Sequence, residues 1–597
     1  MKMSFKNCVL SAVLAAVMCA PAAAKDKAAK DKAGADKAGA GANAVMSYDS
    51  RFHPVIAQNG IVSTQDRLAA QVGRDILARG GNAVDAAVAT GFALAVTHPQ
   101  AGNIGGGGFM VVHLAGQNKT VTLDFREMAP AAASRDMYLD ENGEVDNRLA
   151  RFSRLSAGVP GTVMGLLDAL ETYGTMSRRQ VMGPAIRLAS RGFSASHAFT
   201  ESLESHRDQL SADPSSLEYF FGGGAGYAPG DTIVQHDLAQ SLRRILKDGA
   251  EGFYAGKTAD LIVAEMEAGG GLITREDLAS YKTVIRAPIT GTYKGYTIAS
   301  MPPPSSGGVH IIQMLNMLSE YDLQADGHNS ADYLHKLIEA MRRAFADRSE
   351  YLGDPDFADV PSGALIDPVY NAAQAASINL DAASKSADIR PAAVMPYESP
   401  QTTHYSVLDK DGNAAAVTYT LNFSYGSGYT VDGAGFLLNN EMDDFSAKPG
   451  SPNGYGLIGG EANKIEPKKR PLSSMSPTLV LKDGKAVLVT GSPGGSTIIT
   501  SVLQMVLNVI EWDMNLAQAT TMPRIHHQWL PDVVAIEPGL SRDTLAALEA
   551  RGFTLLKDSA GRYRRTVLGR VNSVGQGEGV VFGAADPRGP KSAALGH

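Results

Sequence analysis

The side chains best placed for chemistry lie on a β-hairpin predicted in the last third of the chain. Alternation with period two predicts strands at Thr402–Leu408 and Ala414–Leu421. The three-residue loop between them, 410–412, ends in a glycine where the left-handed backbone conformation is needed. A loop of this length pairs Asp409 with Asn413 and so fixes which residues face each other along the strands.

The register of this hairpin brings hydroxyl groups together. It predicts that Thr402 lies opposite Thr420, with the side chains of Thr402, Thr420 and Asn422 on one face. A threonine hydroxyl is a weak nucleophile that becomes effective when a base lies within hydrogen-bonding distance. Threonine is also a good strand former, so the pattern by itself leaves a catalytic and a purely structural interpretation open.

A second segment that could support chemistry lies near residue 490. A strand is predicted at Val487–Thr490 and an apolar helix at Ser496–Ile510, with Gly494 and Gly495 in the turn between them. Two glycines before a helix N-terminus expose adjacent N–H groups that can bind a developing oxyanion. An ordinary strand-to-helix turn explains the two glycines equally well.

Other familiar motifs are incomplete. The stretch Gly252–Thr258 has three residues between its glycines where a phosphate loop needs four, and it is predicted to be a turn. The run Gly105–Gly108 lacks the spacing and the acidic partner of a dinucleotide site. His526 and His527 are adjacent, so in a strand they point to opposite faces, and we interpret them as hydrogen-bonded structural residues.

Composition limits the classes of function. The 597 residues include 54 Lys and Arg and 62 Asp and Glu, a net charge of −8 that disfavours binding to nucleic acid through a basic surface. The chain has only two cysteines, Cys8 and Cys19, which excludes cysteine-based zinc motifs. With 44% hydrophobic and 19% charged residues, the composition is typical of a soluble globular protein with a large core.

The N-terminal segment predicts export. Two lysines, an apolar run from Val9 to Met18 and three alanines ending at Ala24 form the regions of a secretory signal peptide, residues 1–24. An uncleaved signal anchor is the less favoured alternative. Residues 25–47, rich in Lys, Ala, Gly and Asp, predict a disordered low-complexity linker. We therefore expect a periplasmic or secreted protein.

The elements that must position these residues predict layered α/β packing, because helices and strands do not alternate regularly. Residues 155–390 are predicted to be mostly helical. The elements expected before them are a helix capped by Ser63 or Thr64 and ending at Gly80-Gly81, a very alanine-rich helix Asn82–Thr97, and strands Phe109–His113 and Thr120–Asp124. The small side chains of the second helix require close packing of its backbone against a neighbour.

Six short segments of the sequence are informative only in combination, because none of them is specific by itself. They are Asp124–Glu127, Pro400–Val407, Thr418–Asn422, Asn439–Phe445, Pro471–Pro477 and Gly491–Gly495. Together, and in this order, they resemble the motifs of the γ-glutamyltranspeptidases, which belong to the N-terminal-nucleophile hydrolase superfamily. The resemblance extends from about residue 62 to about residue 588.

The resemblance implies a fold and a maturation step. The fold is a four-layer αββα sandwich, and the precursor cuts its own Gln401–Thr402 bond. The large chain, compact over residues 48–401, and the small chain, residues 402–597, then form a heterodimer with one interleaved core. Thr402 becomes the nucleophile, and its own α-amine, with a pKa of about 8, becomes the base.

The resemblance also implies a role for each of the other motif residues. A γ-glutamyl donor carries a free carboxylate and a free ammonium, and a guanidinium fork suits the carboxylate. The implied assignments are Thr420 to orient Thr402, Gly494 and Gly495 to bind the oxyanion, Arg126, Ser473 and Ser474 to hold the carboxylate, Asn422, Glu441 and Asp444 to accept from the ammonium, and Tyr455, in the loop 444–471, to close over the donor.

The function implied is that of an exported γ-glutamyltransferase and glutathione hydrolase that needs no metal or organic cofactor. Its partners would be glutathione, other γ-glutamyl compounds, and acceptor amino acids or peptides, with no nucleic acid and no stable membrane anchor. Two alternatives remain: an acylase of the same superfamily that cleaves glutaryl-type amides such as cephalosporins, and a catalytically inactive periplasmic protein that binds γ-glutamyl compounds. Glu441 and Asp444 favour the transferase, because only an ammonium needs them.

Overall fold

The computed structural model describes residues 50–389 and 402–597. The predicted signal peptide (1–24), the predicted linker (25–47) and Gln401 lie outside these residues. No helix in the described ranges is both long and apolar enough to cross a membrane.

Two seven-stranded antiparallel sheets form the centre of the protein. Each sheet mixes strands from before and after the 401–402 bond, so both parts of the chain contribute to one core. In spatial order the first sheet contains β1 (Val55–Ala57), β17 (Val580–Ala585), β16 (Asn572–Gly577), β13 (Lys485–Thr490), β12 (Thr478–Lys482), β9 (Tyr296–Ser300) and β8 (Ile289–Tyr293). The second contains β18 (Ala593–Gly596), β2 (Gly60–Thr64), β10 (Thr403–Asp409), β11 (Ala414–Thr420), β3 (Gly107–Leu114), β4 (Lys119–Phe125) and β7 (Val284–Arg286).

Aliphatic and small side chains fill the space between the two sheets. Ile61, Val111 and Ala416 from the second sheet pack with Leu479 and Val489 from the first, and all five are fully buried. Small residues at this interface let the two sheets approach closely, as in other sheet-on-sheet packings.

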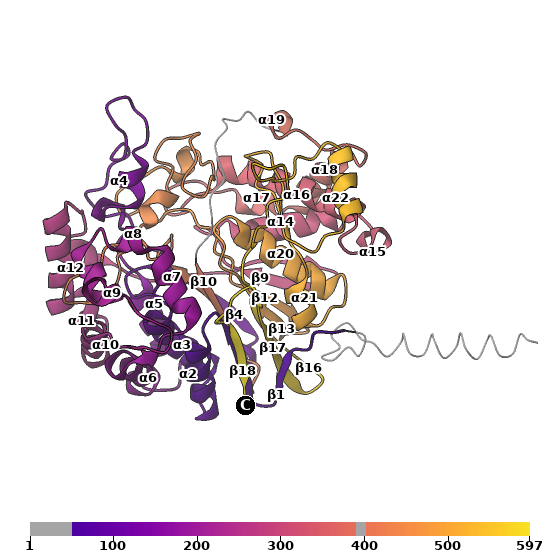
Figure 1. Cartoon of the computed structure of the whole chain (residues 1–597). Helices are drawn as coiled ribbons and strands as arrows, with labels where there is room; N and C mark the ends of the chain where they lie inside the picture. The colour runs from indigo at the N-terminus through magenta and orange to yellow at the C-terminus, as the bar shows by residue number, and fades with distance from the viewer. Residues whose placement is uncertain (1–49, 390–401) are drawn as a thin grey trace, which may run out of the picture.

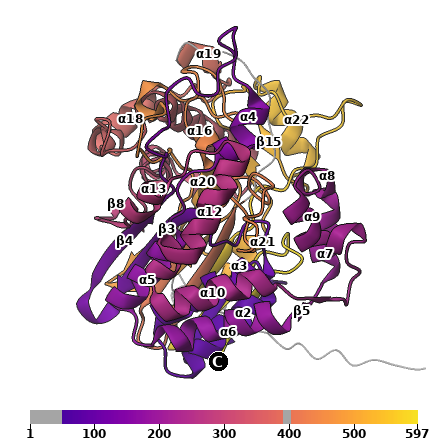
Figure 2. The ribbon, with the colours of Figure 1, turned by 90° about the vertical axis from the view of Figure 1, so that its left-hand side faces the viewer.

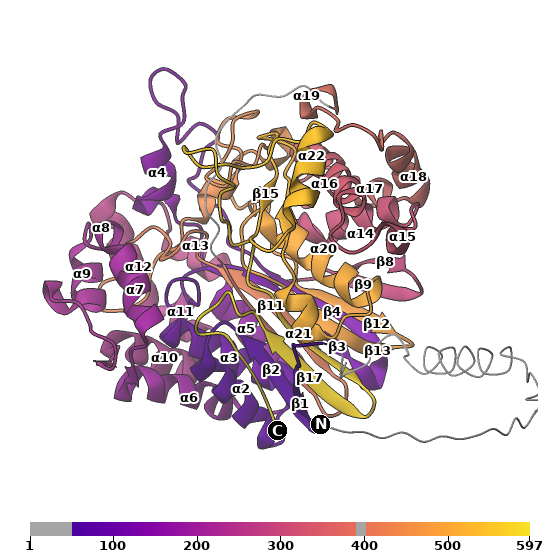
Figure 3. The same ribbon diagram turned by 45° about the vertical axis from the view of Figure 1, so that its right-hand side comes forward.

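Helices cover the outer face of each sheet, which confirms the predicted four-layer αββα fold (Figures 1 and 2). Figure 3 shows both sheets between the two groups of helices, with the C-terminus beside β1 and β2. The second sheet is covered by α2 (Arg67–Ala78), α3 (Ala83–Thr97), α5 (Thr162–Tyr173), α6 (Arg178–Arg191) and α10 (His236–Asp248). The first is covered by α14 (Gly307–Leu318), α16 (Ala331–Tyr351), α20 (Thr497–Ile510) and α21 (Leu516–Thr521).

Further helices and two small sheets surround these layers. They are α4 (Asn147–Arg151), α7 (His197–Ser205), α8 (Arg207–Leu210), α9 (Pro214–Phe221), α11 (Glu251–Tyr254), α12 (Gly256–Gly269), α13 (Arg275–Ser280), α15 (Leu323–Asp326), α17 (Ser362–Leu365), α18 (Pro368–Ala376), α19 (Ser386–Ile389) and α22 (Arg542–Ala550), with the two-stranded sheets β5 (Phe193–Ser194) with β6 (Thr232–Ile233) and β14 (Ile525–His526) with β15 (Ala535–Ile536).

The alanine-rich helix α3 packs as predicted. All of its residues are buried, and Asn82 and Asp85 form a reciprocal capping box at its start. A Cβ on Gly91 would lie 2.7 Å from the Tyr405 hydroxyl of β10, so the helix backbone lies directly against the strand that follows the 401–402 bond.

The first helix begins later than predicted. Asp66, rather than Ser63 or Thr64, caps α2, and its carboxylate accepts from the backbone N–H groups of Leu68 and Ala69 at 3.0 and 3.2 Å. Ser63 and Thr64 cannot cap the helix because they are extended in β2, paired with β10 and β18.

One expectation for the middle of the chain was wrong, whereas the prediction that residues 155–390 are mostly helical is confirmed. The predicted turn Gly252–Thr258 is instead the junction of α11 and α12, with Ala255 between them. The region 155–390 also contributes a hairpin, β8–β9, and the edge strand β7. Its turn residues, Lys294 and Gly295, both have positive φ, +46° and +78°, as a two-residue hairpin turn requires.

The glycine run Gly105–Gly108 brings its own backbone into close contact with the backbone at the end of β11. A Cβ on Gly106 would lie 2.0 Å from the carbonyl oxygen of Thr420, and one on Gly108 would lie 2.4 Å from that of Thr418. Any side chain at these positions must push β11, and Thr420 with it, away from its place.

We therefore expect Gly106→Ala to lower the thermal midpoint of unfolding. The expected loss in free energy of unfolding is about 1–3 kcal/mol, as is typical of overpacking. Scanning calorimetry checks this against Gly116→Ala, where a Cβ meets nothing within 4 Å. Equal midpoints for the two variants would contradict the argument.

Candidate active site

The hairpin places two threonine hydroxyls together, as its register predicts. Thr403 pairs with Tyr419, so Thr402 stands opposite Thr420, and the Thr402 hydroxyl donates to the Thr420 hydroxyl at 3.4 Å. Gly412 closes the loop in the left-handed conformation, with φ +86°. Both threonines are at most 5% exposed, so water has little access to this pair.

The Thr420 hydroxyl is held from its other side by the backbone of Asn422, whose N–H donates to it at 2.9 Å. Asn422 itself lies past the end of β11 with φ +77°. Its side-chain amide donates to the Asn440 carbonyl at 2.9 Å, and it lines the same pocket as the two threonines. Thr402, Thr420 and Asn422 therefore line one pocket. Asn422 enters it from a residue in the left-handed conformation after the strand, and not from the strand itself.

One small pocket, about 270 Å³, collects nearly all the predicted site residues. Of those that the structure describes, Gly494 alone is not in its lining. The lining consists of Arg126, Thr402, Thr420, Asn422, Glu441, Asp444, Tyr455, Ser473, Ser474 and Gly495, completed by Leu457, Met475 and Ile498.

The turn before α20 has the properties expected of an oxyanion site. Gly494 and Gly495 have φ values of +145° and +52°, which side chains other than glycine rarely tolerate. Among the described residues, the N–H groups of both glycines are left without an acceptor. A Cβ on Gly495 would lie 2.6 Å from the ring of Tyr455. The ring of Tyr455 can therefore occupy its place only because residue 495 has no side chain.

Arg126 is fully buried and pairs with the two carboxylates predicted to bind an ammonium. Its Nη1 contacts Glu441, its Nη2 donates to Asp444 Oδ2 at 2.5 Å, and its Nε donates to the Pro471 carbonyl at 3.2 Å. Burial by itself would lower the pKa of Arg126, but Glu441 and Asp444 outweigh it and raise that pKa. The positive and negative parts of the predicted zwitterion site therefore neutralise each other when no substrate is bound.

Glu127 is a third carboxylate in this cluster, and the sequence argument gave it no role. Its side chain is fully buried, 3.5 Å from Arg126 Nη1, and neither of its oxygens has a hydrogen-bond partner in the described part of the chain. Burial raises the pKa of Glu127 to about 7, against the lowering effect of Arg126, and raises the pKa of Glu441 as well. Glu127 and Glu441, two buried carboxylates beside one guanidinium, therefore hold a proton near neutral pH.

A second guanidinium, Arg348 of α16, lies behind the two serines. Its Nε donates to Ser306 Oγ at 3.0 Å and its Nη2 to Ser474 Oγ at 3.4 Å, while Ser306 Oγ donates to the Ser473 carbonyl at 2.8 Å. Burial lowers the pKa of Arg348 to about 10. The spacing of Met341, Phe345 and Arg348 on one helical face is the signal that would have placed it in the interior.

Gln65, at the end of β2, is another residue that the sequence argument missed. Its side-chain amide donates to the Thr402 carbonyl at 3.2 Å and to the Thr403 hydroxyl at 3.0 Å. Nothing in the local sequence marks it, because its role arises from the pairing of β2 with β10.

The predicted lid loop lies closed over the pocket. The Tyr455 hydroxyl donates to the Asn422 carbonyl at 2.8 Å, and its ring packs against Phe423 with centroids 5.0 Å apart. Tyr455 is only 5% exposed. A donor must therefore enter while this loop moves aside.

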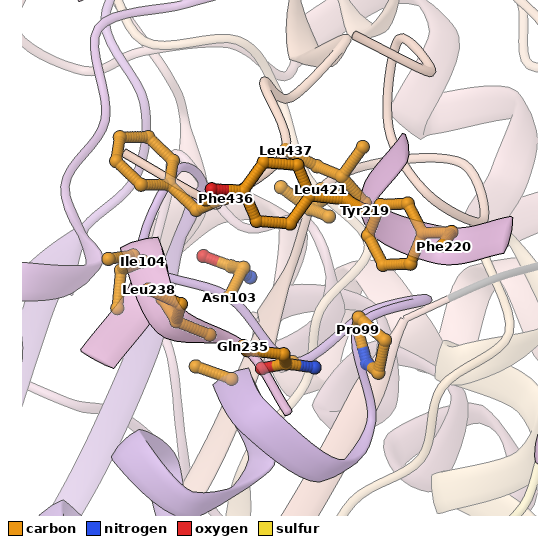
Figure 4. Close-up of a pocket in the computed structure, with 13 residues that line it drawn as sticks. Pro99, Asn103, Ile104, Tyr219, Phe220, Gln235, Leu238, Leu421, Phe436 and Leu437 are labelled. Carbon is orange, nitrogen blue, oxygen red and sulfur yellow. The ribbon is translucent and has the colours of Figure 1, made fainter. Parts of the chain in front are cut away.

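Figure 4 shows a different pocket, which lies behind Leu421 and is not suited to a zwitterion. Apolar side chains such as Leu238, Phe436 and Leu437 line most of it, and Asn103 and Gln235 are its polar members. Asn103 donates to the Thr420 carbonyl at 2.8 Å, so this region supports the hairpin from behind.

The two adjacent histidines are structural, as predicted. His526 bonds Thr500 and Gln528, each at 2.9 Å, whereas His527 bonds Asp532 at 3.1 Å. The two rings thus belong to separate hydrogen-bond networks.

Comparison with known proteins agrees with this geometry. The γ-glutamyltranspeptidase family model matches residues 69–596. The chain is 54% identical over 539 residues to the glutathione hydrolase proenzyme of Escherichia coli (strain K12), covering 90% of this chain and 92% of that one.

Solved structures of similar proteins lead to the same family and to its acylase relatives. A cephalosporin acylase from Bacillus halodurans matches with TM-score 0.81 at 27% identity, covering 92% of this chain and 98% of that one. A γ-glutamyltranspeptidase of Helicobacter pylori matches with TM-score 0.54 at 48% identity, covering 54% of this chain and 93% of that one.

The proton held by the carboxylate cluster should make stability depend on pH. Because the folded-state pKa of Glu127, about 7, lies above its ordinary value, the folded protein binds more protons than the unfolded one, and stability falls as pH rises from about 5 to 8. The thermal midpoint of Glu127→Gln, measured relative to that of the parent, should therefore rise as the pH is raised from 5 to 8. The exposed Glu141→Gln serves as the control and should show no such trend.

Arg348 should act on donor binding through Ser474. We expect Arg348→Met to raise the KM for a γ-glutamyl anilide about tenfold, the loss typical of a hydrogen bond to a charged group, with a smaller change in kcat. Arg348→Lys, which keeps the charge, should recover part of the loss. A KM within a factor of two of the parent for Arg348→Met would show that the contact to Ser474 has no effect on the donor.

Proposed function

The chain belongs to the γ-glutamyltranspeptidase family and is a γ-glutamyltransferase and glutathione hydrolase, and we propose that Thr402 carries the transferred γ-glutamyl group as an ester. The observation that supports this most directly is the Thr402 hydroxyl, which lies in one pocket with Thr420, Arg126 and the carboxylates of Glu441 and Asp444. Glutathione and related amides would be the donors, and water, amino acids or peptides the acceptors.

Maturation would come first. The Thr402 hydroxyl attacks the carbonyl carbon of Gln401, the acyl group shifts from the Thr402 nitrogen to its oxygen, and water hydrolyses the resulting ester. The products are a large chain, compact over residues 48–401, and a small chain of residues 402–597, held together as a heterodimer. The mixed sheets support this, because neither part has a complete core of its own.

In the mature enzyme the freed α-amine of Thr402 would take the hydroxyl proton as the oxygen attacks the γ-carbonyl of the donor. Thr420, fixed by Asn422, orients that hydroxyl. The N–H groups of Gly494 and Gly495 would stabilise the oxyanion, and the proton passes to the departing amine. Water or an acceptor amine then attacks the ester by the same steps in reverse.

Donor binding would exchange ion pairs. The substrate carboxylate replaces the protein carboxylates on Arg126, aided by Ser473 and Ser474, while the substrate ammonium takes Glu441 and Asp444 as its partners. A zwitterion brings both charges, so no buried charge is left unpaired. A glutaryl donor lacks the ammonium and would leave the carboxylates uncompensated, which argues against the acylase alternative.

The location of the enzyme follows from the predicted signal peptide, residues 1–24, and is periplasmic or secreted in this proposal. The catalytically inactive binding protein remains the alternative of a different class. It would give one uncut band on a denaturing gel, whereas the enzyme gives two.

Self-processing provides the main test. Thr402→Ala should yield one folded, uncut and inactive chain, whereas Thr402→Ser should cut and keep some activity, because serine also carries a hydroxyl and an α-amine. Mass spectrometry of both variants and of the parent checks this. A fully active parent enzyme that is intact across 401–402, or a small chain that starts elsewhere, would overturn the assignment of the nucleophile.

Donor specificity provides a second test. Asp444→Asn should raise the KM for γ-glutamyl anilides by roughly ten- to a hundredfold, as expected for lost charge-assisted hydrogen bonds. Glutaryl anilides, which present no ammonium, should lose less. Equal losses on both donors would remove the argument that ranks the transferase above the acylase.

A further inference from the structure

A second cavity is lined by Gln65, whose side chain bonds the main chain of Thr402, and shares no lining residue with the donor pocket. It encloses about 800 Å³, part of it open to solvent, against about 270 Å³ for the donor pocket. Gln65, His98, Ser424, Arg570 and Lys591 line it, and residues of α7 complete the wall. The space is sufficient for a group larger than a single water or ion.

Three of its lining residues connect it to the catalytic elements. Gln65 donates to the Thr402 carbonyl at 3.2 Å, and Ser424 follows Asn422 by two residues. The N–H of Arg570 donates at 3.0 Å to Ser492, which precedes the oxyanion turn. A molecule in this cavity would therefore contact residues that bond the main chain of Thr402 and the side chain of Ser492.

The cavity contains a cation without a counterion. The Arg570 side chain makes no hydrogen bond or ion pair within residues 50–389 and 402–597, and its Nε is buried without an acceptor. Burial lowers the pKa of Arg570, and the nearby carboxylate of Asp586 is already bound by Arg524 at 2.8 Å and Arg588 at 3.1 Å.

His98 adds a second unsatisfied group. It is 3% exposed, and neither ring nitrogen has a partner in the described part of the chain. Burial, together with the charges of Lys591 and Arg570, lowers the pKa of His98, so the ring is neutral and can donate one N–H. Lys591 lies 3.3 Å from Asp66, and the carboxylate in the lining, Glu201, is exposed and screened by solvent.

An anion in this cavity would satisfy groups that otherwise remain unpaired at a considerable cost. In the proposed reaction, the part of the substrate beyond the γ-amide must lie outside the donor pocket. In glutathione that part is a dipeptide ending in a carboxylate, and two extended residues span at most about 7 Å. An acceptor dipeptide presents the same group at the same distance from the reacting amine.

We propose that Arg570 and His98 bind the terminal carboxylate of a short peptide, either the leaving dipeptide of the donor or the acceptor. This inference rests on the proposed function, because it assigns the part of the substrate that the donor pocket does not hold. The assignment makes Arg570 a specificity-determining residue for the peptide side of the reaction.

The experiment compares acids with their C-terminal amides in the full processed enzyme. The donor arm measures hydrolysis of glutathione and of glutathione C-terminal amide. The acceptor arm measures transfer from a γ-glutamyl anilide to Gly-Gly and to Gly-Gly amide. In each arm the result is the ratio of kcat/KM for acid to amide, which cancels any general effect of a substitution on folding or on donor chemistry.

For the parent we expect a ratio of about ten in at least one arm, the size of one charge-assisted hydrogen bond, and the arm that shows it identifies the source of the carboxylate. In Arg570→Gln that ratio should fall to about one, while the exposed Arg565→Gln in the same segment keeps the parent value. Parent ratios near one in both arms, or an unchanged ratio in Arg570→Gln, would overturn the proposal. Hydrolysis of the γ-glutamyl anilide by the parent tests the proposed function separately.

Discussion

The charge of Arg126 constrains the active site more than any other single group. A guanidinium with no exposed surface must be neutralised within the protein, since an unpaired buried charge is strongly destabilising. Its contacts to Pro471, Leu472, Glu441 and Asp444 connect the end of β4 to two segments more than 300 residues away. Those segments carry Glu441, Asp444, Ser473 and Ser474, so these ion pairs also set the positions at which a zwitterion would be bound in the proposed reaction.

A second constraint is the close approach of main chains around Thr420. The glycines before β3 let its backbone lie against that of β11, Asn103 donates to the Thr420 carbonyl, and Asn422 donates to its hydroxyl. Thr402, by contrast, precedes the first residue of β10 and is held through its carbonyl by Gln65. The residue that orients the hydroxyl in the proposed reaction, Thr420, is therefore fixed within the sheet, whereas the proposed nucleophile, Thr402, lies just before the first residue of a strand.

The two cavities beside Thr402 differ in physical character. The donor pocket is small and covered by Tyr455, and its charges pair with one another. The second cavity is wider, and the Arg570 side chain in its wall has no ion-pair partner among the residues that the structure describes. In the proposed reaction this difference separates a site that must exclude water while an ester forms from one that admits exchangeable peptides. In this proposal Thr402 can then react with the groups bound in both cavities.

Much of the site could be read from the sequence, because hairpin register and motif residues are local properties. The loop length alone determined that Thr402 faces Thr420, and six short motifs indicated the residues that line the donor pocket. Among the residues that sequence reasoning missed, Gln65 and Arg348 bond partners far along the chain, Thr402 and Ser474. Glu127 and Arg570 are distinguished by burial, which the local sequence does not show. Likewise, the cap at Asp66 was missed because β2 extends through Ser63 and Thr64 to pair with β10. Only the tertiary structure decided that Arg126 is paired with Glu441 and Asp444 while Arg570 has no such partner within the described ranges, because burial and neutralisation of charge depend on which distant segments pack together.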